Sequence, residues 1–194
     1  MLGTVTATST CTKVPRKGLA RKGSTMDFFR PNAEKISFRV ILKNMKCSGL
    51  PAMDPNGLAD PYIELRLDSK KLKKPSLKKG LCRLLSSKPW PQSRIITRNL
   101  NPVWNKDDDV SIKVLASKEE MLFGSMLLIT IMDYDMASGD DLIGTVQVCL
   151  YNLFSSASTS NGKSMVNVDE YITKNGVKRG KLECEVHMQM TSTN

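Results

Sequence analysis

Three aspartates follow a short apolar segment in a pattern that suits cation binding. Asp133, Asp135 and Asp141 come directly after the run of Leu, Ile and Met at 126–132, which is long enough for a buried strand and too short to span a bilayer. Residues two apart in an extended chain point the same way and lie about 6.5–7 Å apart, so Asp133 and Asp135 aim their carboxylates at one place. The Ser-Gly turn at 138–139 can bring Asp141 back toward them. This group is half of an oxygen cage for a hard cation.

A second acidic loop offers the other half of the cage. Asp54 and Asp60 lie in the turn-rich segment 53–62, which opens onto the apolar stretch 62–67. Without a cation, five like charges placed so close together would repel one another by several kcal/mol, even at an effective dielectric near 20. Calcium prefers such a flexible all-oxygen site, and the absence of His and Cys from both loops argues against zinc. The predicted calcium ligands are the carboxylates of Asp54, Asp60, Asp133, Asp135 and Asp141.

The elements that must position these loops have the periodicity of β-strands. The clearest strand is 180–190, where apolar and polar residues alternate as in an antiparallel strand with one face buried. Eight segments rich in β-branched or apolar residues predict an all-β fold, an eight-stranded antiparallel β-sandwich. They are 36–42, 61–68, 92–98, 109–115, 126–133, 142–149, 166–173 and 180–190.

Three segments resemble the calcium-binding loops of a C2 domain. They are Asp-Pro-Asn-Gly-Leu-Ala-Asp-Pro-Tyr at 54–62, Asn-Leu-Asn-Pro-Val-Trp-Asn at 99–105 and Asp-Tyr-Asp with Asp-Asp-Leu-Ile-Gly at 133–144, in the order of that family. The first is similar to the corresponding loop of conventional protein kinase C. The resemblance covers roughly residues 36–190 and matches all five aspartate positions. It implies a C2-type Greek key in the phospholipase-like strand permutation, because the strand at 180–190 lies at the far end of the chain.

The resemblance also implies roles for residues around the aspartates. Backbone carbonyls such as those of Met53 and Tyr134 would complete the calcium shell, and Asn56 matches a position that contacts the lipid headgroup. Leu58 and Met136 would dip shallowly into the bilayer. Arg94, on the predicted strand before the second loop, is a further predicted lipid contact. The lysines of a basic insertion are also predicted to contact lipid, namely Lys70, Lys71, Lys73, Lys74, Lys78 and Lys79.

The net charge of +10 is concentrated in one segment, since residues 69–98 hold ten Lys or Arg and no acid. A polybasic segment beside an acidic cage favours an anionic phospholipid membrane as partner. Nucleic acid is disfavoured because no aromatic residues are interleaved with the lysines at 70–79. Within a basic insertion at about 69–90, leucines at helical spacing predict an amphipathic helix over 77–86, either docked on the sandwich or lying on lipid.

The expected organisation is a flexible basic arm at 1–35 followed by the sandwich domain at 36–190. The arm has alternative interpretations: an organelle transit peptide, a membrane tether, a phosphorylation site at Ser24 or Thr25, or an uninformative leader. Five scattered cysteines without a secretory segment indicate a reduced, intracellular setting. Together with the expected membrane binding, this predicts a cytoplasmic protein attached peripherally to membranes.

No catalytic constellation is evident in the sequence. The single histidine, His187, has no second histidine and no nucleophile in a suitable pattern, and phosphate-binding glycine motifs are absent. We therefore expect calcium-dependent binding to anionic membranes without an enzymatic activity. The alternative is a scaffold that docks protein partners in a larger assembly, with calcium structural or dispensable.

Overall fold

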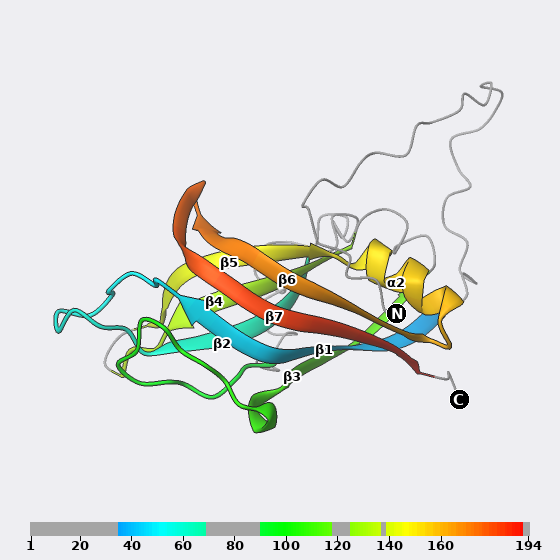
Figure 1. Ribbon diagram of the computed structural model, residues 1–194, viewed down its shortest axis with the longest axis horizontal. Helices are drawn as coiled ribbons and strands as arrows, with labels where there is room; N and C mark the ends of the chain where they lie inside the picture. Colours follow the sequence, from blue (N-terminus) through cyan, green and yellow to red (C-terminus); the bar gives the residue numbers. More distant parts are fainter. Residues whose placement is uncertain (1–34, 69–89, 118–124, 137–138, 192–194) are drawn as a thin grey trace, which may run out of the picture.

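A computed structural model describes residues 35–68, 90–117, 125–136 and 139–191. Figure 1 shows an elongated β-structure with an α-helix at one end and long loops at the other. The elements in chain order are β1 (Lys35–Ser48), β2 (Pro61–Asp68), the short 3₁₀ turn η1 (Lys106–Asp108), β3 (Val110–Ser117), β4 (Met126–Asp133), β5 (Asp141–Cys149), α2 (Leu150–Thr159), β6 (Lys163–Lys174) and β7 (Val177–Thr191).

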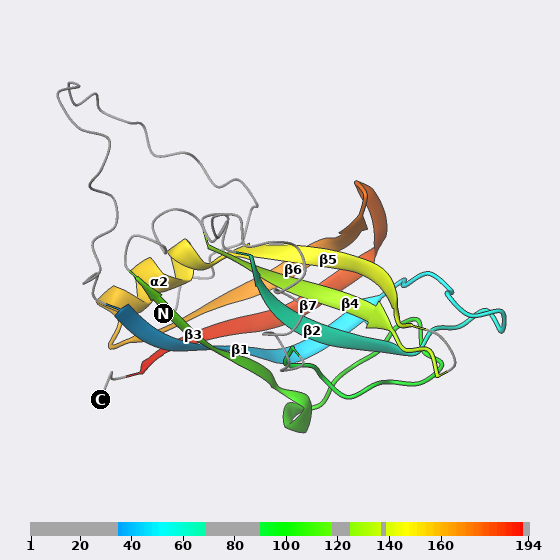
Figure 2. The same cartoon turned by 180° about the vertical axis from the view of Figure 1, so that it is seen from behind.

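The strands form two antiparallel layers that are joined at one point. The hydrogen-bonded order is β2-β4-β5-β6-β7-β1-β3, and β5 meets β6 through the single pair Thr145 and Thr173. Because this ladder is so short, the sheet turns there and places β2-β4-β5 against β6-β7-β1-β3, which Figure 2 shows from behind. The predicted antiparallel β-sandwich is confirmed.

The core lies between the two layers and follows the predicted alternation. In β7, Leu182, Val186 and Met188 are fully buried, and the alternating Glu183 and Glu185 are partly exposed. β7 pairs with β1 over nearly its whole length, so the strand at the far end of the chain occupies an interior position in its layer. The strand predicted at 180–190 is therefore confirmed as β7.

One predicted strand is wrong. Within the described residues, 92–98 forms no regular strand and contributes a single bridge, between Gln92 and Glu64. Pro91 has no N–H to donate, and the Ser93 hydroxyl accepts the N–H of Ile63 at 3.0 Å, where a ladder would use a carbonyl. The segment still runs along the free edge of β2 and bonds to its backbone, so it takes the place of an eighth strand without regular geometry.

The helix α2 was not predicted. Its buried residues recur at helical spacing, namely Leu150, Leu153, Phe154 and Ala157, and the helix packs against β6 and β7 at one end of the sandwich. The helix expected at 77–86 and the arm expected at 1–35, apart from Lys35 in β1, lie outside the described residues. No helix in the described parts of the chain is long and apolar enough to cross a bilayer.

Candidate metal centre

The pairing of β2 with β4 brings the two acidic loops together. The register places Pro61, the first residue of β2, opposite Asp133, the last residue of β4. The loop that leads into β2 therefore ends beside the loop that leaves β4. A further backbone hydrogen bond, from Tyr134 N–H to the carbonyl of Asp60 at 3.0 Å, continues this pairing beyond the strands.

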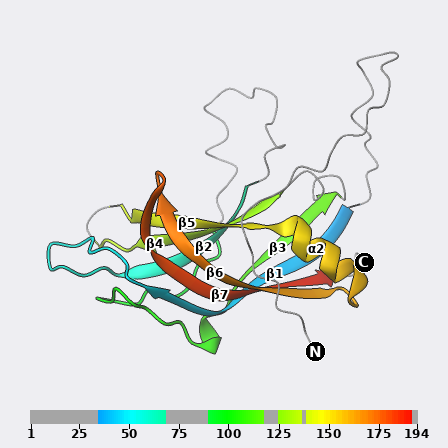
Figure 3. The same ribbon diagram turned by 45° about the horizontal axis from the view of Figure 1, so that its top comes forward.

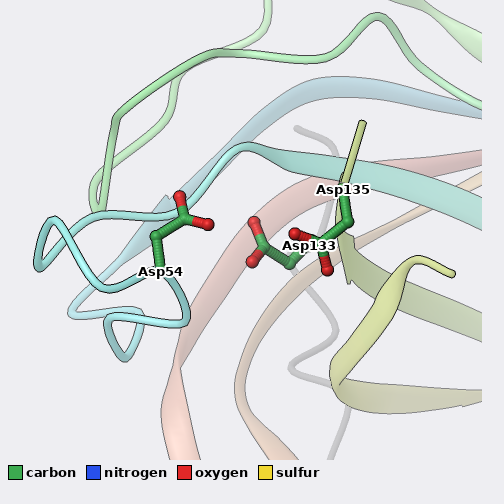
Figure 4. A group of neighbouring side chains, drawn as sticks. All are labelled: Asp54, Asp133 and Asp135. Carbon is green, nitrogen blue, oxygen red and sulfur yellow. The ribbon is translucent and has the colours of Figure 1, made fainter. Parts of the chain in front are cut away.

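Three of the five predicted aspartates form a compact cluster at this junction. Asp54, Asp133 and Asp135 each present a carboxylate oxygen, and these three oxygens all lie within 4.8 Å of one another. Figure 4 shows the side chains converging from the first loop and from the end of β4. Asp133 is only 1% exposed, whereas Asp54 and Asp135 are partly exposed. We refer to these three residues as the aspartate cluster.

The electrostatics of the cluster oppose three ionised carboxylates without a cation. Burial raises the pKa of Asp133, and the neighbouring charges of Asp54, Asp135 and Asp60 raise it further. The N–H of Asp60 donates to Asp133 Oδ1 at 2.6 Å, which acts in the opposite direction by stabilising the ionised form. Two unit charges 4.8 Å apart repel by about 3 kcal/mol at an effective dielectric near 20. A hard cation with oxygen ligands would relieve this repulsion.

The other two predicted ligands lie beside the cluster and make different contacts. The carboxylate of Asp60 accepts the backbone N–H of Arg98 at 2.6 Å and so links the first and second loops. Asp141 begins β5 directly opposite Asp133 in the ladder, and its side chain is exposed. The structure thus groups Asp54, Asp133 and Asp135, while Asp60 and Asp141 border that group.

The first loop is held by its own hydrogen bonds. The carbonyl of Leu58 accepts the N–H groups of Met53 and Asp54, and the side chain of Asn56 accepts the N–H of Leu58 at 2.8 Å. Gly57 has φ of +78°, a conformation that residues with a Cβ rarely adopt. This tight turn fixes the backbone that carries Asp54 and leaves Asn56 exposed and Leu58 half-buried.

Two hydrogen bonds to Asp140 hold the third loop, which links β4 to β5, and the sequence did not predict them. The hydroxyl of Tyr62 on β2 donates to Asp140 Oδ2 at 2.6 Å, and Asp140 Oδ1 accepts the N–H of Asp135 at 3.2 Å. The buried Tyr62 therefore holds Asp140, which in turn holds the backbone of a cluster residue. Burial and the Asp140 carboxylate both raise the pKa of the Tyr62 hydroxyl, because each disfavours its ionised form.

Comparison with known proteins decides the family. The family model described as the C2 domain matches residues 38–165, which is well over half of the chain. This chain belongs to the C2 domain family. The family expected from the loop sequences is therefore confirmed.

Relatives of this C2 domain include much larger proteins. It is 26% identical over 128 residues to a C2 and GRAM domain-containing protein of Arabidopsis thaliana, and 35% identical over 104 residues to multiple C2 and transmembrane domain-containing protein 1 of Rattus norvegicus. The matches span 66% and 54% of this chain but only 10% and 8% of those relatives. Among solved structures, a C2 domain of plant extended synaptotagmin 1 has a TM-score of 0.52 at 17% identity, covering 82% of this chain and 99% of that one.

The residues predicted to contact lipid are placed differently from one another in this C2 domain. Met136 is 89% exposed just after the aspartate cluster. Tyr134, predicted only as a backbone-carbonyl ligand of calcium, is 37% exposed beside it. Arg94 pairs with Asp108 at 3.0 Å, so its charge is partly neutralised. The lysines predicted at 70–79 lie outside the described residues.

Proposed function

We propose that this C2 domain binds calcium through the aspartate cluster and, when calcium is bound, attaches to anionic phospholipid membranes. The observation that carries the proposal is the convergence of Asp54, Asp133 and Asp135 within 4.8 Å, with Asp133 buried at the end of a core strand. A buried carboxylate surrounded by like charges is costly to maintain without a compensating cation. The oxygen-only cluster suits calcium better than zinc or copper.

The proposed shell extends beyond the cluster to its immediate neighbours. Asp60 and Asp141 border the cluster and supply further carboxylates, and the backbone carbonyls of Met53 and Tyr134 belong to the same two loops. We propose all four as additional ligands. The Asp60 backbone already bonds to Asp133 and Tyr134, so only its carboxylate has to turn toward the ion.

Charge reversal explains how the cation would control membrane attachment. Without calcium, the loop end carries several negative charges and repels an anionic surface. Bound calcium neutralises those charges and can itself coordinate lipid phosphate, so repulsion becomes attraction. Contacts by Asn56, Leu58 and Met136 would then place the loop tips in the headgroup region, and Met136 is exposed enough for shallow insertion. The module is proposed to act by binding alone.

Vesicle sedimentation tests the proposal directly. We expect the protein to sediment with vesicles of phosphatidylserine and phosphatidylcholine in calcium, and to remain in the supernatant in chelator or with phosphatidylcholine alone. The double variant Asp133→Asn, Asp135→Asn should lose the calcium response and keep its fold, because asparagine retains the size and one acceptor oxygen of aspartate. The single variant Asp107→Asn is a control for the loss of a carboxylate elsewhere, since Asp107 is exposed and lies outside the cluster. Equal sedimentation with and without calcium would reject the proposal and favour the protein-docking scaffold.

A further inference from the structure

The β6–β7 hairpin carries a basic tip that no sequence prediction assigned to a function. Asn175 and Gly176 form its two-residue turn with φ of +53° and +78°, and Lys174 pairs with Val177 to close it. The segment 171–182 contains four Lys or Arg and no acidic residue. A strand pair that ends in a tight turn holds these charges on a rigid support.

Two contacts fix the hairpin at the loop end of the sandwich. The Lys174 ammonium donates to the carbonyl of Leu142 at 2.7 Å, where β5 begins after the third loop. Gly180 has φ of +109°, and a Cβ there would lie 2.8 Å from the carbonyl oxygen of Ser48, where β1 ends and the first loop begins. The base of the hairpin therefore lies against the ends of β5 and β1, which adjoin the third and first loops. Figures 1 and 3 show its tip at the end that carries these loops, opposite α2.

The tip presents unneutralised charge beside apolar surface. Lys178 and Arg179 are exposed, and no carboxylate in the described parts of the chain pairs with either of them. The Lys178 ammonium lies 3.4 Å from the centre of the Tyr171 ring, which orients it, and Tyr171 is itself 52% exposed. Val177, next to the turn, is 55% exposed. We call Val177, Lys178 and Arg179 the hairpin tip.

We propose that the hairpin tip is a second membrane contact, which takes anionic phospholipid headgroups on the same bilayer surface as the calcium loops. The inference rests on the proposed membrane binding and adds a contact that needs no cation. Basic charges attract lipid phosphate and carboxylate, while Val177 and the Tyr171 ring suit the interfacial region. An acidic protein partner would also match the charge. The position beside the calcium loops favours the bilayer, because one flat surface can touch both.

The test compares two double variants with the same change in net charge. Lys178→Gln, Arg179→Gln removes the charges of the hairpin tip. Lys113→Gln, Lys163→Gln is the control, since both lysines are exposed and Lys163 begins β6 at the opposite end of the same hairpin. Binding to phosphatidylserine vesicles is titrated with calcium and with chelator, at low and at near-physiological salt. Circular dichroism and melting temperature establish that the variants are folded.

Each basic residue near an anionic surface contributes about fivefold to partitioning at moderate salt, so the tip variant should bind roughly 25-fold more weakly than the parent. The loss should shrink as salt is raised, because screening acts over about 8 Å at physiological ionic strength. The control variant should bind like the parent. Calcium affinity measured in solution should be unchanged in both, because neither pair touches the aspartate cluster.

The outcomes separate this inference from the proposed function. If the tip variant binds as tightly as the parent, or if the control is weakened as much as the tip variant, the inference is overturned. If the parent binds vesicles equally with calcium and with chelator, and the tip variant loses this salt-sensitive binding, the tip contact stands and the calcium proposal fails. If the parent does not bind vesicles under any of these conditions, both fail, and a protein partner for the tip becomes the next hypothesis.

Discussion

Replacing Asp133 by asparagine should stabilise the calcium-free protein and remove most of its stabilisation by calcium. Asp133 is buried and lies within 4.8 Å of the Asp54 and Asp135 oxygens, so its ionised form is opposed by desolvation and by two like charges. Asparagine removes the charge but keeps an oxygen that can accept the Asp60 N–H. The substitution therefore separates the electrostatic cost of the site from the packing around it.

The magnitude follows from the geometry. Each like-charge pair at 4.8 Å costs about 3 kcal/mol at an effective dielectric near 20. The partial exposure of Asp54 and Asp135 screens this repulsion, so a net gain of about 1–2 kcal/mol is expected in Asp133→Asn. For a domain of this size, that gain raises the melting temperature by roughly 2–8 °C. In the parent, calcium at 100 times its dissociation constant adds about 2.7 kcal/mol, which the variant should largely lose.

Calorimetry in chelator and in calcium measures both effects on the same samples. The melting temperatures of parent and variant should cross, with Asp133→Asn higher in chelator and the parent higher in calcium. The control Asp107→Asn, an exposed aspartate outside the cluster, should change neither value appreciably. A variant that melts no higher than the parent in chelator and keeps the calcium shift would refute the reasoning, since Asp133 would then be neither strained nor a ligand.

Three further perturbations have defined expectations. The folded-state pKa of Asp133 is raised above 3.8, so the stability that its protonation provides is lost as pH rises through that pKa. In chelator, the difference in melting temperature between Asp133→Asn and the parent should therefore grow with pH and then level off. A difference that does not change with pH would contradict this. Tyr62→Phe frees Asp140 and should weaken calcium binding by about two- to tenfold in calorimetric titration, whereas Tyr171→Phe should not. Gly180→Ala should lower the free energy of unfolding by about 2 kcal/mol in denaturant titration because it forces a Cβ against the Ser48 carbonyl; an effect near zero would place the hairpin elsewhere.

Local spacing predicted seven of the strands and part of the site, whereas the strand predicted at 92–98 is wrong. Alternation at 180–190 was enough to identify β7, and the separation of Asp133 and Asp135 by one residue was enough to predict that their carboxylates cooperate. The helical spacing of the apolar residues in 150–157 was also present in the sequence, but the predicted elements left this stretch as a connection between strands. A search for helical as well as strand periodicity in the connections would have found α2.

Contacts between distant segments could not be predicted in the same way. Tyr62 and Asp140 are 78 residues apart, and their hydrogen bond exists only because β2 begins beside the third loop. The Asp60 carboxylate accepts the Arg98 N–H for a similar reason, because two loops from different parts of the chain meet. Contacts between loops that are far apart in the chain leave no periodic pattern in the sequence. Matching motif positions therefore identified which aspartates gather at this end, without identifying which of them form the compact cluster.

The hairpin tip shows why the net charge of a long segment does not predict the sign of the charge at each place on its surface. Residues 99–194 carry more acids than bases, so the basic hairpin was averaged into an acidic region. In the folded protein, many of those acids are engaged: Glu183 pairs with Lys46, and hydrogen bonds from His187 and Asn44 lower the pKa of Glu185. Lys178 and Arg179 have no such partners in the described structure. The field at the loop end is therefore set by which charges remain unpaired after folding, and at the tip of this hairpin the unpaired charges are basic.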